Sequence, residues 1–224
     1  MKIDVLYKPA HSVAHVTLDA GESIVAESGA MVSTSGNVQM TTSAGGLKSG
    51  IKRLFGGESF FRNTFTAEGA PGEVLLAPAL CGDMTVVDVD EHDWFIASSA
   101  YVGGAPTVDI QTKVGGFKGF FSGAGVFILR ATGHGLVALG AFGALECVEV
   151  DGELTIDTGH LVAWADTPEL QYRVGKASSG WIASFLSGEG LVCKFSGKGK
   201  VWVQTRNPSE YGTLIGRMLP PRKN

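Results

Sequence analysis

The chain repeats one pattern of residues three times, and this repeat limits its possible folds more than any other feature. In each copy a glycine precedes a valine by two positions, within a longer glycine-bounded segment. Internal repeats of this kind indicate an architecture of similar units packed against one another. The three segments are GESFFRNTFTAEGAPGEVLLA (57–77), GAGVFILRATGHGLVALGAFG (123–143) and GEGLVCKFSGKGKVWVQTR (188–206).

A second block precedes each of these segments and supports the same alignment. It places Ala30, Ala100 and His160 in one column and follows them two positions later with a valine each. Gly69, Gly133 and Gly197 also align in the first block. We therefore expect three tandem repeats, at about 14–78, 84–142 and 147–205.

Within each repeat, β-branched and aromatic runs alternate with glycine-rich breaks, which is typical of short strands and turns. The pairs Gly133/Gly135 and Gly197/Gly199, and the dipeptide Asp151-Gly152, are typical of tight hairpin turns. The pattern predicts an all-β fold, with three β-rich repeats in one compact domain (1–224) of pseudo-threefold symmetry. A short tail (208–224) is expected to form one or two helical turns before Pro220 and Pro221 end it.

Composition narrows the classes of function. Of 224 residues, 44% are apolar and only 18% are charged, which favours a folded domain over disorder. The net charge of −4 gives no basic footprint for nucleic acid. Three cysteines without a C-x-x-C motif favour reduced thiols and a cytoplasmic location. We also expect no membrane span and no signal peptide.

Candidate chemistry in the sequence is weak. Asp157-Thr158-Gly159 matches the tripeptide of aspartic proteases, but no second copy exists to supply the other carboxylate, so a turn is favoured. His11 and His15 are four residues apart, about 13 Å along a strand, which is too far for one metal ion. We expect no catalytic residues, no metal and no cofactor.

One segment, 45–63, has unusual character because apolar residues recur at helical spacing beside three basic ones. A short helix of this kind could contact an anionic membrane or a partner, or it could simply pack on the sheet. The equivalent segments of the other repeats are apolar but hardly basic. The candidate contact residues are Leu47, Lys48, Ile51, Lys52, Arg53, Phe117, Phe120, Trp181 and Phe185.

GGLKSGIKRLFGGESFF, DTGHLVAW (157–164) and SGEGLV (187–192) resemble the mitochondrial-biogenesis AIM family over roughly residues 10–207. The resemblance implies three units like the tryptophan-responsive RNA-binding attenuation protein (TRAP), within the double-stranded β-helix class. It also implies oligomerisation, and its mitochondrial members are linked to inner-membrane organisation. It supplies no catalytic or ligand residues.

Three hypotheses of function remain. The first is a non-enzymatic, homo-oligomeric scaffold or interaction protein, with an anionic membrane surface or a protein as its partner. The second is a small-molecule-binding protein or enzyme that uses a β-helix cavity. The third is an RNA-binding protein by analogy of fold, which the acidic composition makes the least favoured.

Overall fold

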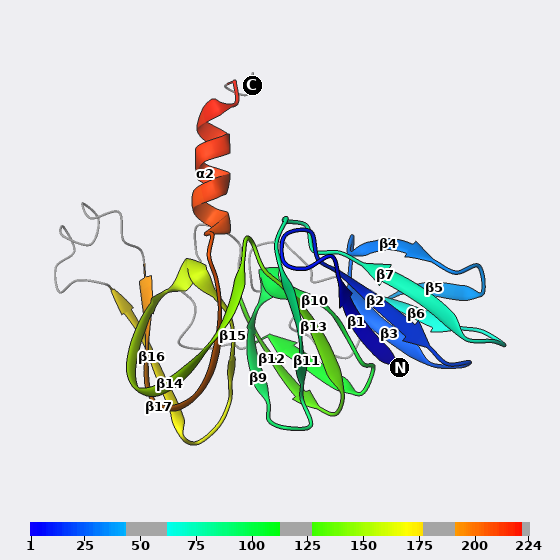
Figure 1. Ribbon diagram of the computed structural model, residues 1–224, viewed down its shortest axis with the longest axis horizontal. Helices are drawn as coiled ribbons and strands as arrows, with labels where there is room; N and C mark the ends of the chain where they lie inside the picture. Colours follow the sequence, from blue (N-terminus) through cyan, green and yellow to red (C-terminus); the bar gives the residue numbers. More distant parts are fainter. Residues whose placement is uncertain (44–61, 113–126, 177–190, 221–224) are drawn as a thin grey trace.

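The runs of β-branched and aromatic residues form strands, as the sequence predicts. The computed structural model describes residues 1–43, 62–112, 127–176 and 191–220 (Figure 1). In β2 (Val13–Leu18), Ala14, Val16 and Leu18 are fully buried while the residues between them are partly exposed. This alternation buries one face of a pleated strand. The protein is all-β, apart from α2 (Pro208–Met218) and two 3₁₀ turns among the described residues.

After β1 (Lys2–Leu6), the strands fall into three consecutive sets. Set 1 is β2, β3 (Ser23–Glu27), β4 (Met31–Thr34), β5 (Val38–Ser43), β6 (Arg62–Ala67) and β7 (Gly72–Leu76). Set 2 is β8 (Met84–Asp88), β9 (Trp94–Ala97), β10 (Tyr101–Gly104), β11 (Val108–Thr112), β12 (Ile128–Gly133) and β13 (Leu136–Gly140). Set 3 is β14 (Leu145–Asp157), β15 (Leu161–Ala165), β16 (Leu170–Lys176) and β17 (Leu191–Gln204).

The three sets pair their strands in the same order. In set 1, β7 lies between β2 and β4, and β6 lies between β3 and β5. In set 2, β13 lies between β8 and β10, and β12 lies between β9 and β11. In set 3, β14 and β17 pair with each other along almost their whole length, so each takes the place of two strands. β15 pairs with one half of β17, and β16 pairs with the other half. Each set therefore forms two groups of three strands, which belong to different sheets in sets 1 and 2 and to one sheet in set 3.

Neighbouring sets share sheets through two joints of the same kind. At each joint the second strand of one set pairs with the third strand of the next set: β3 with β10, and β9 with β15. In set 3 the two halves of β14 count as the first and second strands, so β15 is the third. The sets consequently lie in a row from β4 and β5 at one end to β14, β16 and β17 at the other (Figure 1). Among the described strands, pairing joins only neighbouring sets, so this row shows no threefold axis of the kind that we expected.

The expected hairpins at the glycine pairs are wrong. β12 and β13 flank Gly133 and Gly135 but belong to different sheets and do not pair with each other. β17 runs straight through Gly197 and Gly199, and β14 runs through Gly152, which lies directly opposite Gly197. At this corner, between β12 and β13, the chain passes from one sheet to another, whereas at the equivalent corner of set 3 β14 and β17 continue within one sheet. Gly133, Gly135, Gly152 and Gly197 have the positive φ values that glycine adopts without steric cost.

Gly133 and Gly197 both have positive φ values, of 103° and 101°. The alignment of Gly69 with these two is wrong. Gly133 pairs with Val108 and Gly197 with Leu170, whereas the residue that pairs with Val38 is Ala67. Three extra residues between β6 and β7 place Gly69 beyond the corner, and a comparison of letters alone could not reveal that offset.

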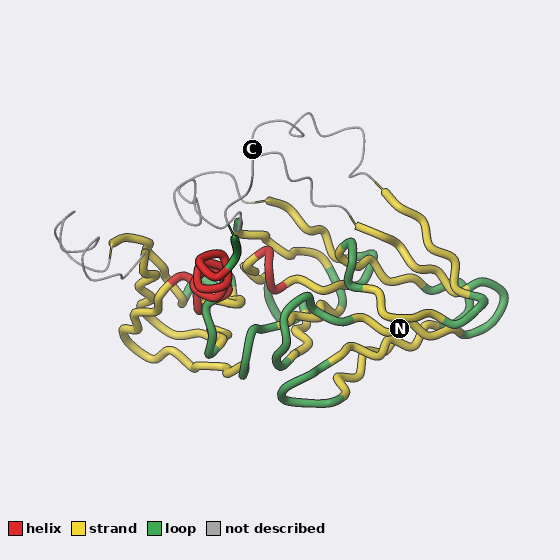
Figure 2. The backbone as a smooth tube through the Cα atoms, turned by 90° about the horizontal axis from the view of Figure 1, so that it is seen from above, coloured by secondary structure: helices red, strands yellow, loops and turns green. Residues whose placement is uncertain are grey.

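The tail forms a longer helix than expected. α2 covers 11 residues, where one or two turns were predicted, and it ends before Pro220. It rises from the body in Figure 1 and is seen nearly end on in Figure 2. Asn207 caps its first turn, because its side-chain oxygen accepts hydrogen bonds from the backbone of Ser209 and Glu210.

Candidate contact surfaces

α2 carries an apolar stripe that the described residues leave uncovered. Tyr211, Leu214, Ile215 and Met218 are spaced i, i+3, i+4 and i+7, so they lie on one face of the helix. They are 45%, 52%, 37% and 70% exposed, and α2 has no buried residue. Apolar stripes of surface helices normally face a core. This helix therefore makes little use of its stripe in packing on its own sheets, which makes the stripe a candidate contact surface.

The base of α2 is held against the body at two points. The ring of Tyr211 lies 5.1 Å from the ring of Phe142. Asn207 packs so closely over Gly159 that a Cβ added there would lie 2.5 Å from the Asn207 Cγ. Gly159 belongs to the D-T-G segment, so this segment contacts the N-terminal end of α2.

The geometry of the D-T-G segment confirms the turn interpretation. The carboxylate of Asp157 accepts a hydrogen bond from the backbone N–H of Gly159 at 2.8 Å and caps a 3₁₀ turn over Thr158–His160. The neighbouring His160 places Nδ1 2.8 Å from the carbonyl oxygen of Gln204. Both side chains fix the chain path before β15.

A second apolar surface lies on β4, at one end of the row. Met31 and Val32 are 44% and 54% exposed, and all four residues of β4 are exposed. β4 pairs with β7 on one side, and among the described residues no strand pairs with its other side. It is an uncovered sheet edge with apolar side chains on it.

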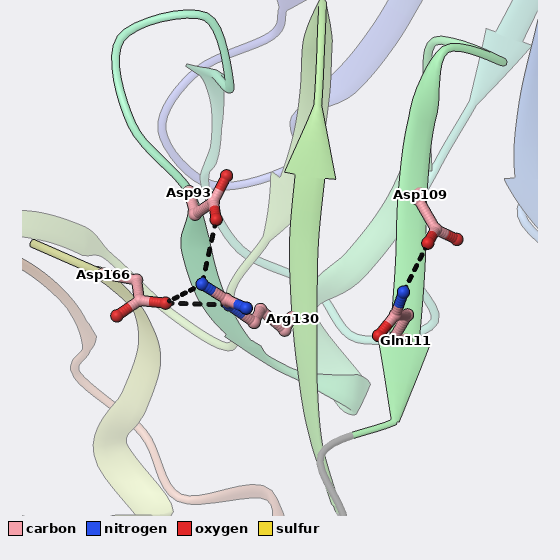
Figure 3. A network of polar contacts seen from close by, with 5 residues as sticks. All are labelled: Asp93, Asp109, Gln111, Arg130 and Asp166. Atoms are coloured by element: carbon pink, nitrogen blue, oxygen red, sulfur yellow. Dashed lines mark hydrogen bonds and ion pairs between the residues drawn. The ribbon is translucent and has the colours of Figure 1, made fainter.

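A charged cluster ties sets 2 and 3 together beside their joint (Figure 3). Arg130 of β12 donates from Nε to Asp166 at 2.8 Å and from a terminal nitrogen to Asp93 at 3.0 Å. Asp93 precedes β9 and Asp166 follows β15, so one guanidinium bridges the ends of the two paired strands. Its role is to fix the joint.

Burial raises the pKa of several described groups, and three of them bear on the joints and the core. It raises the pKa of Glu27 to about 7 and that of the Cys193 thiol to about 12. It also raises the pKa of Tyr101, whose hydroxyl donates to the carbonyl oxygen of Val25 across the β3–β10 joint. A thiol with a raised pKa is a poor nucleophile. Cys193 therefore belongs to the core, where it is fully buried.

Other expected features are scattered through the fold. In the ranges that the structure describes, no three His, Cys, Asp or Glu side chains gather into a possible metal site. The imidazole of His15 lies 3.3 Å from the carboxylate of Glu73.

All nine candidate contact residues, from Leu47 to Phe185, lie outside the described residues. The stripe on α2 was missed, although its spacing is visible in the sequence, because Gly212 and Gly216 lower the helical propensity.

Comparison with known proteins places the whole arrangement in one family. The family described as "Mitochondrial biogenesis AIM24" matches residues 3–206, which is nearly the whole chain. The chain belongs to the AIM24 family. An uncharacterized protein of Streptococcus pyogenes serotype M6 is 28% identical over 225 residues, a match covering 95% of this chain and 88% of that protein.

The fold is also present in a solved structure. The X-ray crystal structure of a Streptococcus pyogenes protein superposes with a TM-score of 0.77 at 22% identity, covering 97% of this chain and 99% of that one. At this identity the likeness shows a shared fold. Within the described parts of this AIM24-family chain, no helix is long and apolar enough to cross a membrane.

Proposed function

We propose that this AIM24-family protein is a non-enzymatic, oligomeric scaffold that uses α2 to contact an anionic membrane surface. The observation that carries the proposal is the uncovered stripe of α2. Elsewhere among the described residues, the large apolar side chains mostly lie in three buried clusters, one centred on each set. An exposed stripe on a projecting helix is what an interfacial helix needs.

Charge favours an anionic surface as the partner of α2. Arg217 lies in the last turn of the helix, and Arg222 and Lys223 follow in the sequence. Cations at this end of a helix also interact favourably with its dipole. Apolar side chains would enter the headgroup region while the basic groups meet lipid phosphates.

The proposal includes the repeat. We infer that the three sets descend from one TRAP-like unit of the double-stranded β-helix class, which the common pairing order supports. An experimental structure in which one set pairs its strands in another order would contradict this inference. The repeat matters for function because each set can join the next.

Flotation with vesicles tests the membrane contact. The purified full chain is mixed with phosphatidylglycerol vesicles or with neutral phosphatidylcholine vesicles, and the floating fraction is measured. Burial of each large apolar side chain contributes about 1.5–3 kcal/mol, so Leu214→Ser with Ile215→Ser should lower binding more than tenfold. Thr213→Asn, on another face of α2, is the control and should bind like the wild type. The membrane contact would be refuted if the wild type, the double variant and the control gave equal floating fractions, or if the wild type did not float at all.

A further inference from the structure

The two ends of the row are complementary halves of the joint that holds the sets together. Each internal joint pairs a second strand with a third strand, as β3–β10 and β9–β15 do. Set 1 has a third strand, β4, that pairs on one side only among the described strands. Set 3 has a second strand, the Glu153–Asp157 part of β14, that pairs with β17 and with no other described strand.

The exposed fraction of Val32 shows that β4 lacks a neighbouring strand. Val102 and Val162 hold the equivalent position in β10 and β15, where they are 2% and 0% exposed, whereas Val32 is 54% exposed. Val102 packs in the same core cluster as Ile24 and Ala26 across its joint. Val162 likewise shares a cluster with Trp94 and Ile96. Val32 therefore lacks the second strand that covers its two counterparts.

The other end lacks the matching cover. Leu154 and Ile156 hold the positions of Trp94 and Ile96, which are 3% and 0% exposed, yet both are only partly buried. β4 thus lacks a second strand beside it, and the second half of β14 lacks a third strand. Each end of the row carries the type of strand that the other end lacks.

β4 is also built for pairing. Its pairing with β7 has an irregularity between Met31 and Ser33, and β10 and β15 show the same irregularity at the equivalent residues and still form their joints. Natural sheet edges are usually protected by charged residues or proline. β4, with the sequence MVST, has neither.

We propose that copies of this chain join head to tail, with Glu153–Asp157 of one copy pairing antiparallel with β4 of the next. The internal joints set the register. Ala26 pairs with Gly103, and Ile96 with Ala163. By the same offsets, Ile156 of one copy pairs with Ser33 of the next, and Thr155 with Thr34. A contact between two different surfaces, repeated, closes a ring or extends a filament.

This inference rests on the oligomeric part of the proposed function and is tested by blocking each edge separately. Val32→Lys places a charge where Val102 and Val162 are buried, and Ile156→Lys does the same at the other edge. Each variant alone should fall from the wild-type mass to the monomer mass in light scattering. Met40→Lys, which changes an exposed residue of β5 away from the joint, is the control and should keep the wild-type mass. Thermal melting checks folding, and Thr155→Glu replaces Ile156→Lys if that variant unfolds.

Mixing the two variants separates head-to-tail joining from other contacts. Each blocked copy retains the edge that the other lacks, so the mixture should form a one-to-one dimer. A wild-type monomer would overturn this inference together with the oligomeric scaffold. A wild-type oligomer that both blocked variants retain would overturn this inference alone. Dimers formed by Ile156→Lys alone would show that β4 pairs with itself, which also overturns it.

Discussion

Phe95 and Trp164 lie directly opposite each other across the β9–β15 joint, with ring centroids 5.3 Å apart. Phe95 belongs to set 2 and Trp164 to set 3, and both are buried. The joint between sets 2 and 3 is therefore stabilised in two ways. Backbone hydrogen bonds join the two strand edges, and the buried aromatic pair packs across them. Aromatic pairs of this geometry add to the stabilisation from burial.

Trp164→Ala should destabilise the protein by about 3–5 kcal/mol, because it leaves a large cavity at the joint. Equilibrium unfolding in urea measures the loss. Met40→Ala, at a 52% exposed position, should change the free energy of unfolding by about 0.5 kcal/mol or less. A loss below about 1 kcal/mol for Trp164→Ala would contradict a packed joint.

Gly197→Val should cost more than about 1 kcal/mol, because a β-branched residue is strained at positive φ. The φ of Gly197 is 101°, and an added Cβ would also collide with the backbone oxygen of Glu169. Gly175→Val is the matched control within β16, since a Cβ there meets nothing within 4 Å. Thermal melting should show a lower Tm for the first variant only, and equal Tm values would contradict the corner at Gly197.

Glu27 should make the protein less stable as pH rises from about 4.5 to about 7. Burial raises its pKa to about 7 from the ordinary value of 4.5, so the folded state keeps a proton that the unfolded state has released. The stabilisation from this group is fully present below about pH 4.5 and is lost as the pH rises from about 4.5 to about 7. Glu27→Gln should remove that loss, which is about 1 kcal/mol for a partly exposed carboxyl. Urea unfolding at pH 5 and pH 8 measures it, and an unchanged pH slope in the variant would contradict the shift.

The sequence predicts strand content well and strand pairing poorly. Alternation in β2 and the β-branched runs of β7 and β13 are local signals, so the all-β class follows from them. Whether Gly133 and Gly135 form a hairpin or a corner depends on which distant strands β12 and β13 join. Those partners, β9 and β8, begin more than 30 residues earlier in the chain, and no local pattern specifies them.

The candidate contact surface shows the same division. The stripe on α2 is readable from the spacing of Tyr211, Leu214, Ile215 and Met218, but its exposure is a property of the assembled fold. Val32, Val102 and Val162 occupy one column of the repeat. Their identical side chains gave no sign that two are buried and one is exposed. That difference depends on whether a neighbouring set is present.

Cross-linking tests head-to-tail joining most directly. Residues opposite each other in antiparallel strands lie about 4.5–5.5 Å apart at Cα, which suits a disulfide. Copies carrying Thr34→Cys are mixed with copies carrying Thr155→Cys, both in a Cys81→Ser background because Cys81 is the exposed native thiol. We expect an oxidised dimer whose linking peptide joins positions 34 and 155. Replacing Thr34→Cys by Met40→Cys should abolish it. Absence of the 34–155 link, or a faster 34–34 link, would contradict the account.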